Sequence, residues 1–135
     1  MKLKKIMIVS ANYYPDISSN MEKNVKNYLL DICNDFNVGS LKLNVPGVFE
    51  IPVTIARNIK KCDAFIALGC VIKGETPHFD FISKSSTDAL MNLSIQFKKP
   101  IGNGILTCLN MKQALVRSKK KGTEAAKAVI SVLSQ

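Results

Sequence analysis

The chain has 135 residues, of which 47% are hydrophobic and 21% charged, and its formal net charge is +9. This length and composition predict one folded domain over residues 1–135 and argue against disorder. No apolar run is long enough to cross a bilayer, and the basic start of the chain lacks the apolar length and cleavage site of a signal peptide. We therefore expect a cytoplasmic protein with no membrane partner.

The positive charge could reflect a nucleic acid partner, an anionic substrate or a Lys-rich proteome. Lysines are spread along the chain with one cluster at residues 119–121, and no basic stripe alternates with aromatic residues. We therefore expect no nucleic acid partner, since a phosphorylated small molecule explains the charge equally well. The four cysteines have no spacing typical of metal ligands and the chain has one histidine, so we expect reduced, mostly buried thiols and no metal.

The first half of the chain predicts a strand over residues 6–10, a loop over 11–16 and a helix over about 18–36. A strand over 38–43, a turn over 44–47 and a helix over 49–59 follow. Pro15 is expected to exclude a helix from the loop. Ser18, Ser19 or Asn20 can cap the first helix, whose apolar residues recur at spacings of three and four. Pro52 suits the first turn of the second helix.

The second half predicts a strand over residues 64–68, a turn over 73–77 and a helix over about 81–97. A strand over 101–106, a short helix over 111–117 and a last helix over 123–133 follow. Gly69 is expected to end the smooth part of its strand, and Thr123 to cap the last helix. Gly102 and Gly104 lie inside a predicted strand, which suggests a close approach by other backbone. Because strand and helix alternate throughout, we predict the α/β class, a three-layer α/β/α domain on a four-stranded parallel sheet.

In such a sheet the carboxyl ends of the strands open toward one edge, where ligands bind. The loops there supply aromatic rings, a carboxylate and the one histidine, in Tyr13, Tyr14, Phe49, Glu50, the 73–78 segment, and Asn103 or residues 107–110. This combination predicts a site for a planar, anionic small molecule.

Each of these residues also has a purely structural interpretation. His78 could act as a general acid or base, because imidazole exchanges protons near neutral pH, or it could merely cap a helix. Residues 74–76 could hold a phosphate through backbone N–H groups, with Arg117 or Lys121 as its cation, or they could form an ordinary glycine turn before a helix. Arg117 could equally be a solvated helix residue. Tyr13 could stack on a planar ring or simply pack.

Three segments, residues 46–52 (PGVFEIP), 67–80 (ALGCVIKGETPHFD) and 102–107 (GNGILT), resemble lumazine synthase, an enzyme of riboflavin biosynthesis. The resemblance covers nearly the whole chain in order, and it implies a flavodoxin-like sheet. It also implies a cofactor-free condensation of 5-amino-6-(D-ribitylamino)uracil with 3,4-dihydroxy-2-butanone 4-phosphate. The products would be 6,7-dimethyl-8-ribityllumazine, phosphate and water, so the partners are two small-molecule substrates, one of them phosphorylated.

The resemblance further implies a role for each matching residue. Tyr13 would stack on the pyrimidine, and His78 would transfer protons. The ribityl chain and the pyrimidine would be held by Val48, Phe49, Glu50, Cys70, Val71 and Ile72. The phosphate would be bound by Glu75, Thr76, Arg117 and Lys121.

Because sites in this family lie between subunits, the resemblance implies a homopentamer in which Asn103 reaches into the next protomer's site. Asn12 stands where many members have Arg, and residues 108–111 lack the usual acidic residue. The connection between Arg117 and Gly122 is about four residues shorter than the form found in icosahedral members. We therefore expect no sixty-subunit capsid, although a decamer is compatible with the sequence.

Alternative functions remain open at this point. The altered 108–111 segment suggests a non-catalytic flavin- or lumazine-binding protein on the same scaffold, although the intact catalytic set argues against it. An RNA-binding module is supported by charge alone. A related enzyme that joins two lumazines to make riboflavin would be distinguished by its substrate.

Overall fold

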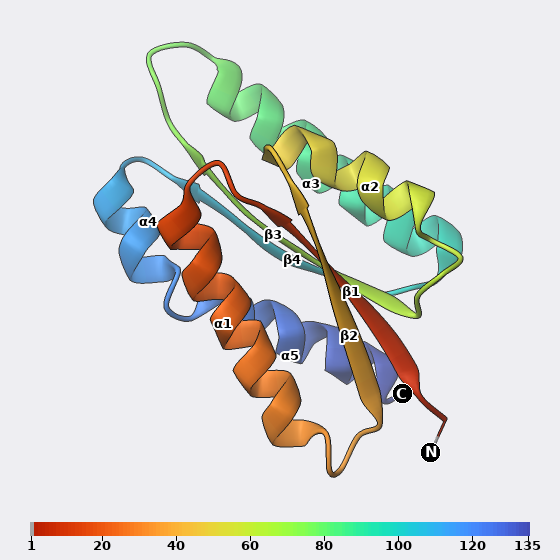
Figure 1. Ribbon diagram of the computed structural model, residues 1–135. Coiled ribbons are helices and arrows are strands. Elements are labelled where there is room, and N and C mark those ends of the chain that lie inside the picture. Colours follow the sequence, from red (N-terminus) through yellow and green to blue (C-terminus); the bar gives the residue numbers. More distant parts are fainter. Residues whose placement is uncertain (1) are drawn as a thin grey trace.

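Four parallel strands form the centre of the structure, a computed structural model that describes residues 2–135 (Figure 1). The strands are β1 (Lys4–Ala11), β2 (Val38–Val45), β3 (Ala64–Ile72) and β4 (Ile101–Cys108). They lie in the order β2-β1-β3-β4, and every neighbouring pair is parallel. The predicted four-stranded parallel sheet is therefore confirmed.

Helices cover both faces of this sheet. One face carries α1 (Pro15–Ile32), α4 (Met111–Arg117) and α5 (Lys121–Leu133). The other carries α2 (Ile51–Arg57), preceded by the single 3-10 turn η1 (Val48–Glu50), and α3 (His78–Phe97). This is the predicted three-layer α/β/α arrangement of the flavodoxin-like type. Within residues 2–135, no helix is both long and apolar enough to cross a membrane.

The core is divided by the sheet into two clusters, and β3 contributes to both. Residues 64–70 of β3 are all buried, because this strand has a neighbour on each side and helices on each face. Ile66 and Leu68 pack toward α1 and α5, whereas Phe65 and Ala67 pack toward α2 and α3. Burial on both faces explains why residues 64–68 form a continuous apolar run in the sequence.

β3 does not end at Gly69, as the sequence suggested, but continues to Ile72. A Cβ atom at Gly69 would lie 2.7 Å from Val48 Cγ2 and 3.3 Å from Ala11 Cβ. The glycine therefore makes room for η1 against the middle of the strand and does not mark its end.

The prediction that Pro15 excludes a helix was wrong, because α1 begins at this residue. Proline is tolerated in the first helical turn, where its missing N–H has no helical partner in any case. Tyr14 occupies the N-cap position without a side-chain hydrogen bond. Ser18, predicted as a cap, is buried inside the helix, and its hydroxyl donates to Pro15 O at 3.2 Å.

Other boundaries also moved. The helix predicted over 49–59 consists of η1 and the shorter α2, and α3 begins three residues before the predicted start, at His78. α5 begins at Lys121 with Lys120 as its N-cap, so Thr123 does not cap it.

The close backbone approach predicted at two glycines of β4 is confirmed. A Cβ atom at Gly102 would lie 2.6 Å from Ala125 O, and one at Gly104 would lie 2.8 Å from Ala67 O. Both strand positions therefore have no room for a side chain, and α5 packs directly on the backbone of β4.

Candidate active site

A cavity of about 640 Å³ opens at the carboxyl end of the sheet. It lies between the β1–α1 loop, the β2–η1 turn, the end of β3 and the first turn of α3, as parallel α/β sheets predict. Its lining consists of Tyr13, Tyr14, Pro46, Gly47, Val48, Phe49, Glu50, Cys70, Val71, Ile72, His78 and Ile82. The structure thus brings together residues from three separate segments that the sequence predicted to lie at one site.

Two aromatic rings at the cavity remain largely open to solvent. Tyr13 is 71% exposed and Phe49 is 70% exposed. Tyr13 makes an edge-to-face contact with Tyr14, with ring centroids 5.0 Å apart and an interplanar angle of 76°. Tyr13 thus contacts Tyr14 and still exposes most of its ring, which suits stacking on a planar ligand.

The inner wall of the cavity is neutral. Burial raises the pKa of the Cys70 thiol to about 12, with a further contribution from the neighbouring Cys108 thiol. Burial also raises the pKa of Tyr14, aided by Cys70 and Tyr13. Near neutral pH both groups are therefore uncharged, so this wall carries neither a thiolate nor a phenolate.

His78 is the first residue of α3, and its side chain lines the cavity. Its backbone N–H donates to Thr76 Oγ1 at 3.4 Å, and no side chain caps α3. A capping role for the imidazole is therefore not supported. Ile82 lies one turn further along the same face, and sequence reasoning missed it although the i, i+4 spacing from His78 could have indicated it.

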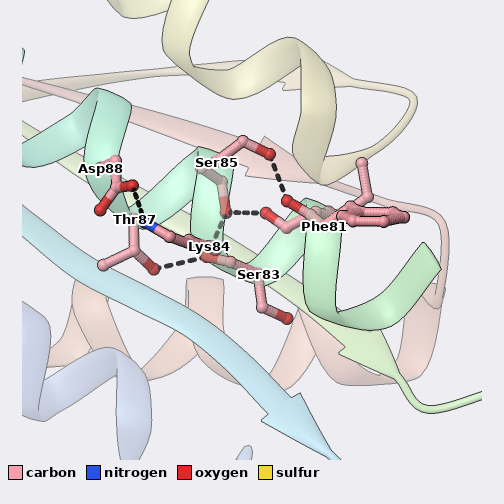
Figure 2. A network of polar contacts seen from close by, with 8 residues as sticks. Phe81, Ser83, Lys84, Ser85, Thr87 and Asp88 are labelled. Atoms are coloured by element: carbon pink, nitrogen blue, oxygen red, sulfur yellow. Dashed lines mark hydrogen bonds and ion pairs between the residues drawn. The ribbon is translucent and has the colours of Figure 1, made fainter. Parts of the chain in front are cut away.

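Most hydroxyl groups that follow on α3 are engaged within the helix itself (Figure 2), whereas the buried Ser83 Oγ has no hydrogen-bond partner among the described residues. The Ser85 hydroxyl donates to Phe81 O, and the Thr87 hydroxyl donates to Ser83 O at 2.7 Å. Lys84 Nζ pairs with Asp88 Oδ2 at 2.7 Å on the exposed surface of the helix. The hydroxyl groups of Ser85 and Thr87 are thus satisfied within α3, and the polar residues that line the cavity include His78 and Glu50.

The residues predicted to bind a phosphate lie outside the cavity lining. Glu75 and Thr76 belong to the exposed β3–α3 loop, and Arg117 and Lys121 lie at the two ends of the α4–α5 connection. The loop and α4 are linked through Cys108, because Lys73 N donates to Cys108 O at 2.9 Å and Arg117 Nη1 lies 4.0 Å from Cys108 Sγ.

Asn103 also lies outside the cavity. It is an exposed residue of the edge strand β4, and its Oδ1 accepts a hydrogen bond from Ile105 N at 3.1 Å. In the β3–β4 register Asn103 pairs with Ala67, three residues before Cys70, where β3 begins to line the cavity. Of the residues that the structure describes, no lysine or arginine lines the cavity.

The cysteines follow the prediction of free, mostly buried thiols. Cys33 is exposed, whereas Cys62, Cys70 and Cys108 are buried, and all are free in the described chain. Within residues 2–135, no group of three or more His, Cys, Asp or Glu side chains could hold a metal ion.

The fold and the cavity together define a class of protein. It is an α/β protein with helices on both faces of a parallel sheet. The cavity at the carboxyl end of the strands offers an aromatic ring for stacking on a planar ligand and an imidazole for proton transfer. Residues 3–135 match the family model described as 6,7-dimethyl-8-ribityllumazine synthase, and the chain belongs to this family.

Several relatives carry the same description over nearly the whole chain. The 6,7-dimethyl-8-ribityllumazine synthase of Bdellovibrio bacteriovorus is 37% identical over 96% of this chain and 73% of its own length. That of Agrobacterium fabrum is 38% identical over 95% of this chain and 91% of its own. The protein of Rhodopseudomonas palustris described as 6,7-dimethyl-8-ribityllumazine synthase 1 is 39% identical over 96% and 83%.

Proposed function

We propose that the cavity is the site at which this chain joins 5-amino-6-(D-ribitylamino)uracil to 3,4-dihydroxy-2-butanone 4-phosphate. The chain is a transferase of riboflavin biosynthesis, and the product is 6,7-dimethyl-8-ribityllumazine, with phosphate and water released. The single observation that carries the site assignment is the convergence of Tyr13, residues 48–50, residues 70–72 and His78 on one cavity.

Each part of the lining suits one part of this reaction. The exposed face of Tyr13 stacks on the pyrimidine, and the neutral wall formed by residues 70–72 accepts the heterocycle without a charge penalty. Glu50 and the backbone of residues 48–49 hold the hydroxyl groups of the ribityl chain. His78 moves protons during imine formation and phosphate loss, because its ring has no competing partner among the described residues.

The phosphate requires positive charge that one protomer does not bring to its own cavity. We propose that a neighbouring protomer supplies it, with Arg117, Lys121 and Asn103 on one surface completing the cavity formed by a different surface of the next copy. An interface between two different surfaces repeats around an axis and closes as a ring. The family resemblance suggests a ring of five, hence a homopentamer and no sixty-subunit capsid.

Two further aspects of the function remain predictions. Nothing in the cavity favours the non-catalytic binding alternative, because Tyr13, Glu50 and His78 are all present in its lining. The proposed location in the cytoplasm rests on the sequence prediction and would be checked by fractionation of the producing cell. Mass photometry checks the assembly, since a megadalton shell would contradict a pentamer.

The first test is an absorbance and fluorescence assay with both substrates, comparing wild type with Arg117→Ala. We expect product from wild type and a loss of about 2–4 kcal/mol of transition-state stabilisation in the variant. Arg57→Ala is a matched control, because Arg57 is the only other arginine and is exposed at the end of α2, outside the cavity lining. Full activity in Arg117→Ala would show that the phosphate is bound elsewhere.

A second test asks whether the site is shared between protomers. His78→Asn and Arg117→Ala subunits, each of low activity alone, are unfolded, mixed in equal amounts and refolded together. If adjacent copies supply the two residues, about a quarter of the sites regain both in a randomly mixed ring, and activity returns. If one protomer supplies both residues, no site is restored and the mixture stays at the level of the separate variants.

A further inference from the structure

The α4–α5 corner, defined here as residues 118–121, is tied to α1 by side-chain amides. Asn24 Nδ2 donates to Ser118 O at 3.0 Å and to Lys119 O at 2.7 Å. Asn20 Nδ2 donates to Ser118 Oγ at 3.1 Å, and this hydroxyl in turn donates to Leu115 O at 2.7 Å. Ser118 is completely buried, so its hydrogen bonds are shielded from solvent.

The corner needs such external support because α4 is short. A helix of seven residues is marginal on its own, so most of its stability must come from packing and from contacts outside the helix. The amides of α1 satisfy two carbonyls just beyond the carboxyl end of α4. At the other side of the corner, a Cβ atom at Gly122 would lie 2.4 Å from Met21 O, so the backbone of α5 rests directly on α1. Figure 1 shows α4, the corner and α5 beside α1 on one face of the sheet.

Arg117, which directly precedes the corner, and Lys121, its last residue, have few constraints of their own. Among the described residues, no ion pair involves Arg117 or Lys121. The one polar side-chain contact of Arg117 is the 4.0 Å approach to Cys108 Sγ, which is weak because sulfur is a poor acceptor. The placement of both cations therefore depends on the backbone that carries them, and that backbone is held by α1.

We propose that Asn24, assisted by Asn20, is a positioning residue that sets where Arg117 and Lys121 stand toward the phosphorylated substrate. This role rests on the proposed function of the two cations. Asparagine suits it because one NH₂ group donates two hydrogen bonds, and Asn24 uses both on adjacent carbonyls. Without these bonds the corner and the end of α4 shift, and a displacement of about 1 Å is enough to weaken a preorganised contact.

The test compares Asn24→Ala and Asn24→Asp with wild type, because aspartate keeps the shape but offers no donor to the two carbonyls. We expect KM for the butanone phosphate and the inhibition constant of inorganic phosphate to rise roughly tenfold in both variants. KM for the ribitylaminouracil should stay within about twofold, since none of residues 118–121 lines the cavity with Tyr13 and residues 48–50. Asn27→Ala is the matched control, because Asn27 is an exposed asparagine one turn further along α1 and makes no side-chain hydrogen bond in the described chain.

Several outcomes would overturn the inference. Unfolding in urea at a lower concentration with unchanged KM and unchanged phosphate inhibition would reduce Asn24 to a purely structural role. An equal rise of both KM values would mean that the whole site is disturbed. If Asn24 variants do not fold, Asn20→Ala removes only one bond and should raise the phosphate inhibition constant about threefold, and no rise would refute the role.

The failure of this inference is distinguishable from failure of the proposed function. A wild-type protein that makes no lumazine from the two substrates would refute the function. Binding of inorganic phosphate by calorimetry would then still test the corner, with weaker binding expected for Asn24→Ala and equal binding contradicting the proposal.

Discussion

Replacing Gly122 with alanine tests how closely α5 packs on α1. The new Cβ atom would meet Met21 O at 2.4 Å, Met21 C at 3.1 Å and Met21 Cα at 3.2 Å. All three are backbone atoms of a buried helical residue, so no side-chain rotation relieves the overlap. Such overpacking costs about 1–3 kcal/mol, and the contact with backbone puts this site at the upper end. Alanine returns at most about 1 kcal/mol through helix propensity, so we expect a net loss of about 2 kcal/mol.

The assay is urea unfolding followed by circular dichroism at one fixed protomer concentration, because the proposed assembly would make stability concentration-dependent. Gly74→Ala is the control, since a Cβ atom at Gly74 would meet nothing within 4 Å. That variant should match wild type or gain up to about 1 kcal/mol from the lower entropy of its unfolded chain. A Gly122→Ala protein as stable as wild type would refute the close contact between the two helices.

Three further predictions concern the cavity. His78→Asn should lower kcat by about 10²–10⁴-fold with both KM values nearly unchanged, as steady-state assays with each substrate varied would measure. A kcat equal to that of wild type would contradict the proton-transfer role. Iodoacetamide at pH 8 should label exposed Cys33 and spare Cys70, whose pKa is raised to about 12; mass spectrometry showing equal labelling would refute this. Between about pH 9, where the unfolded Cys70 thiol ionises, and its folded pKa, wild type should lose about 1.4 kcal/mol of stability per pH unit relative to Cys70→Ala, as urea titrations at pH 8 and 10 would reveal.

The fold class was predictable because alternation of strand and helix admits few topologies. The element boundaries were not, because their causes lie far away in the chain. Gly69 looked like the end of a strand, yet its role is to admit Val48, which precedes it by 21 residues. Pro15 looked like a helix breaker, although the first helical turn is the position where proline fits.

The candidate site was predictable in part for a similar reason. The rule that parallel strands open toward one edge brought Tyr13, Glu50 and His78 to one cavity. The same rule placed Asn103 there as well, but Asn103 pairs with Ala67, three residues before the Cys70–Ile72 end of β3 that lines the cavity. The link between Asn24 and Ser118 spans 94 residues and follows no motif, so only the folded structure reveals it.

The central position of β3 has a consequence for how the protein fluctuates. Opening β3 would break its ladders with β1 and β4 together and expose both core clusters, so its amide hydrogens should exchange with solvent only when the whole domain unfolds. β2 lies at an edge with mostly exposed residues, and its amides should exchange through much smaller openings. The cavity combines these extremes, because Cys70 and Val71 extend from the slowest-exchanging strand while Pro46 and Gly47 follow the fastest. In the proposed site the heterocycle would thus rest on a rigid floor, and the side assigned to the ribityl chain would yield as the substrate enters.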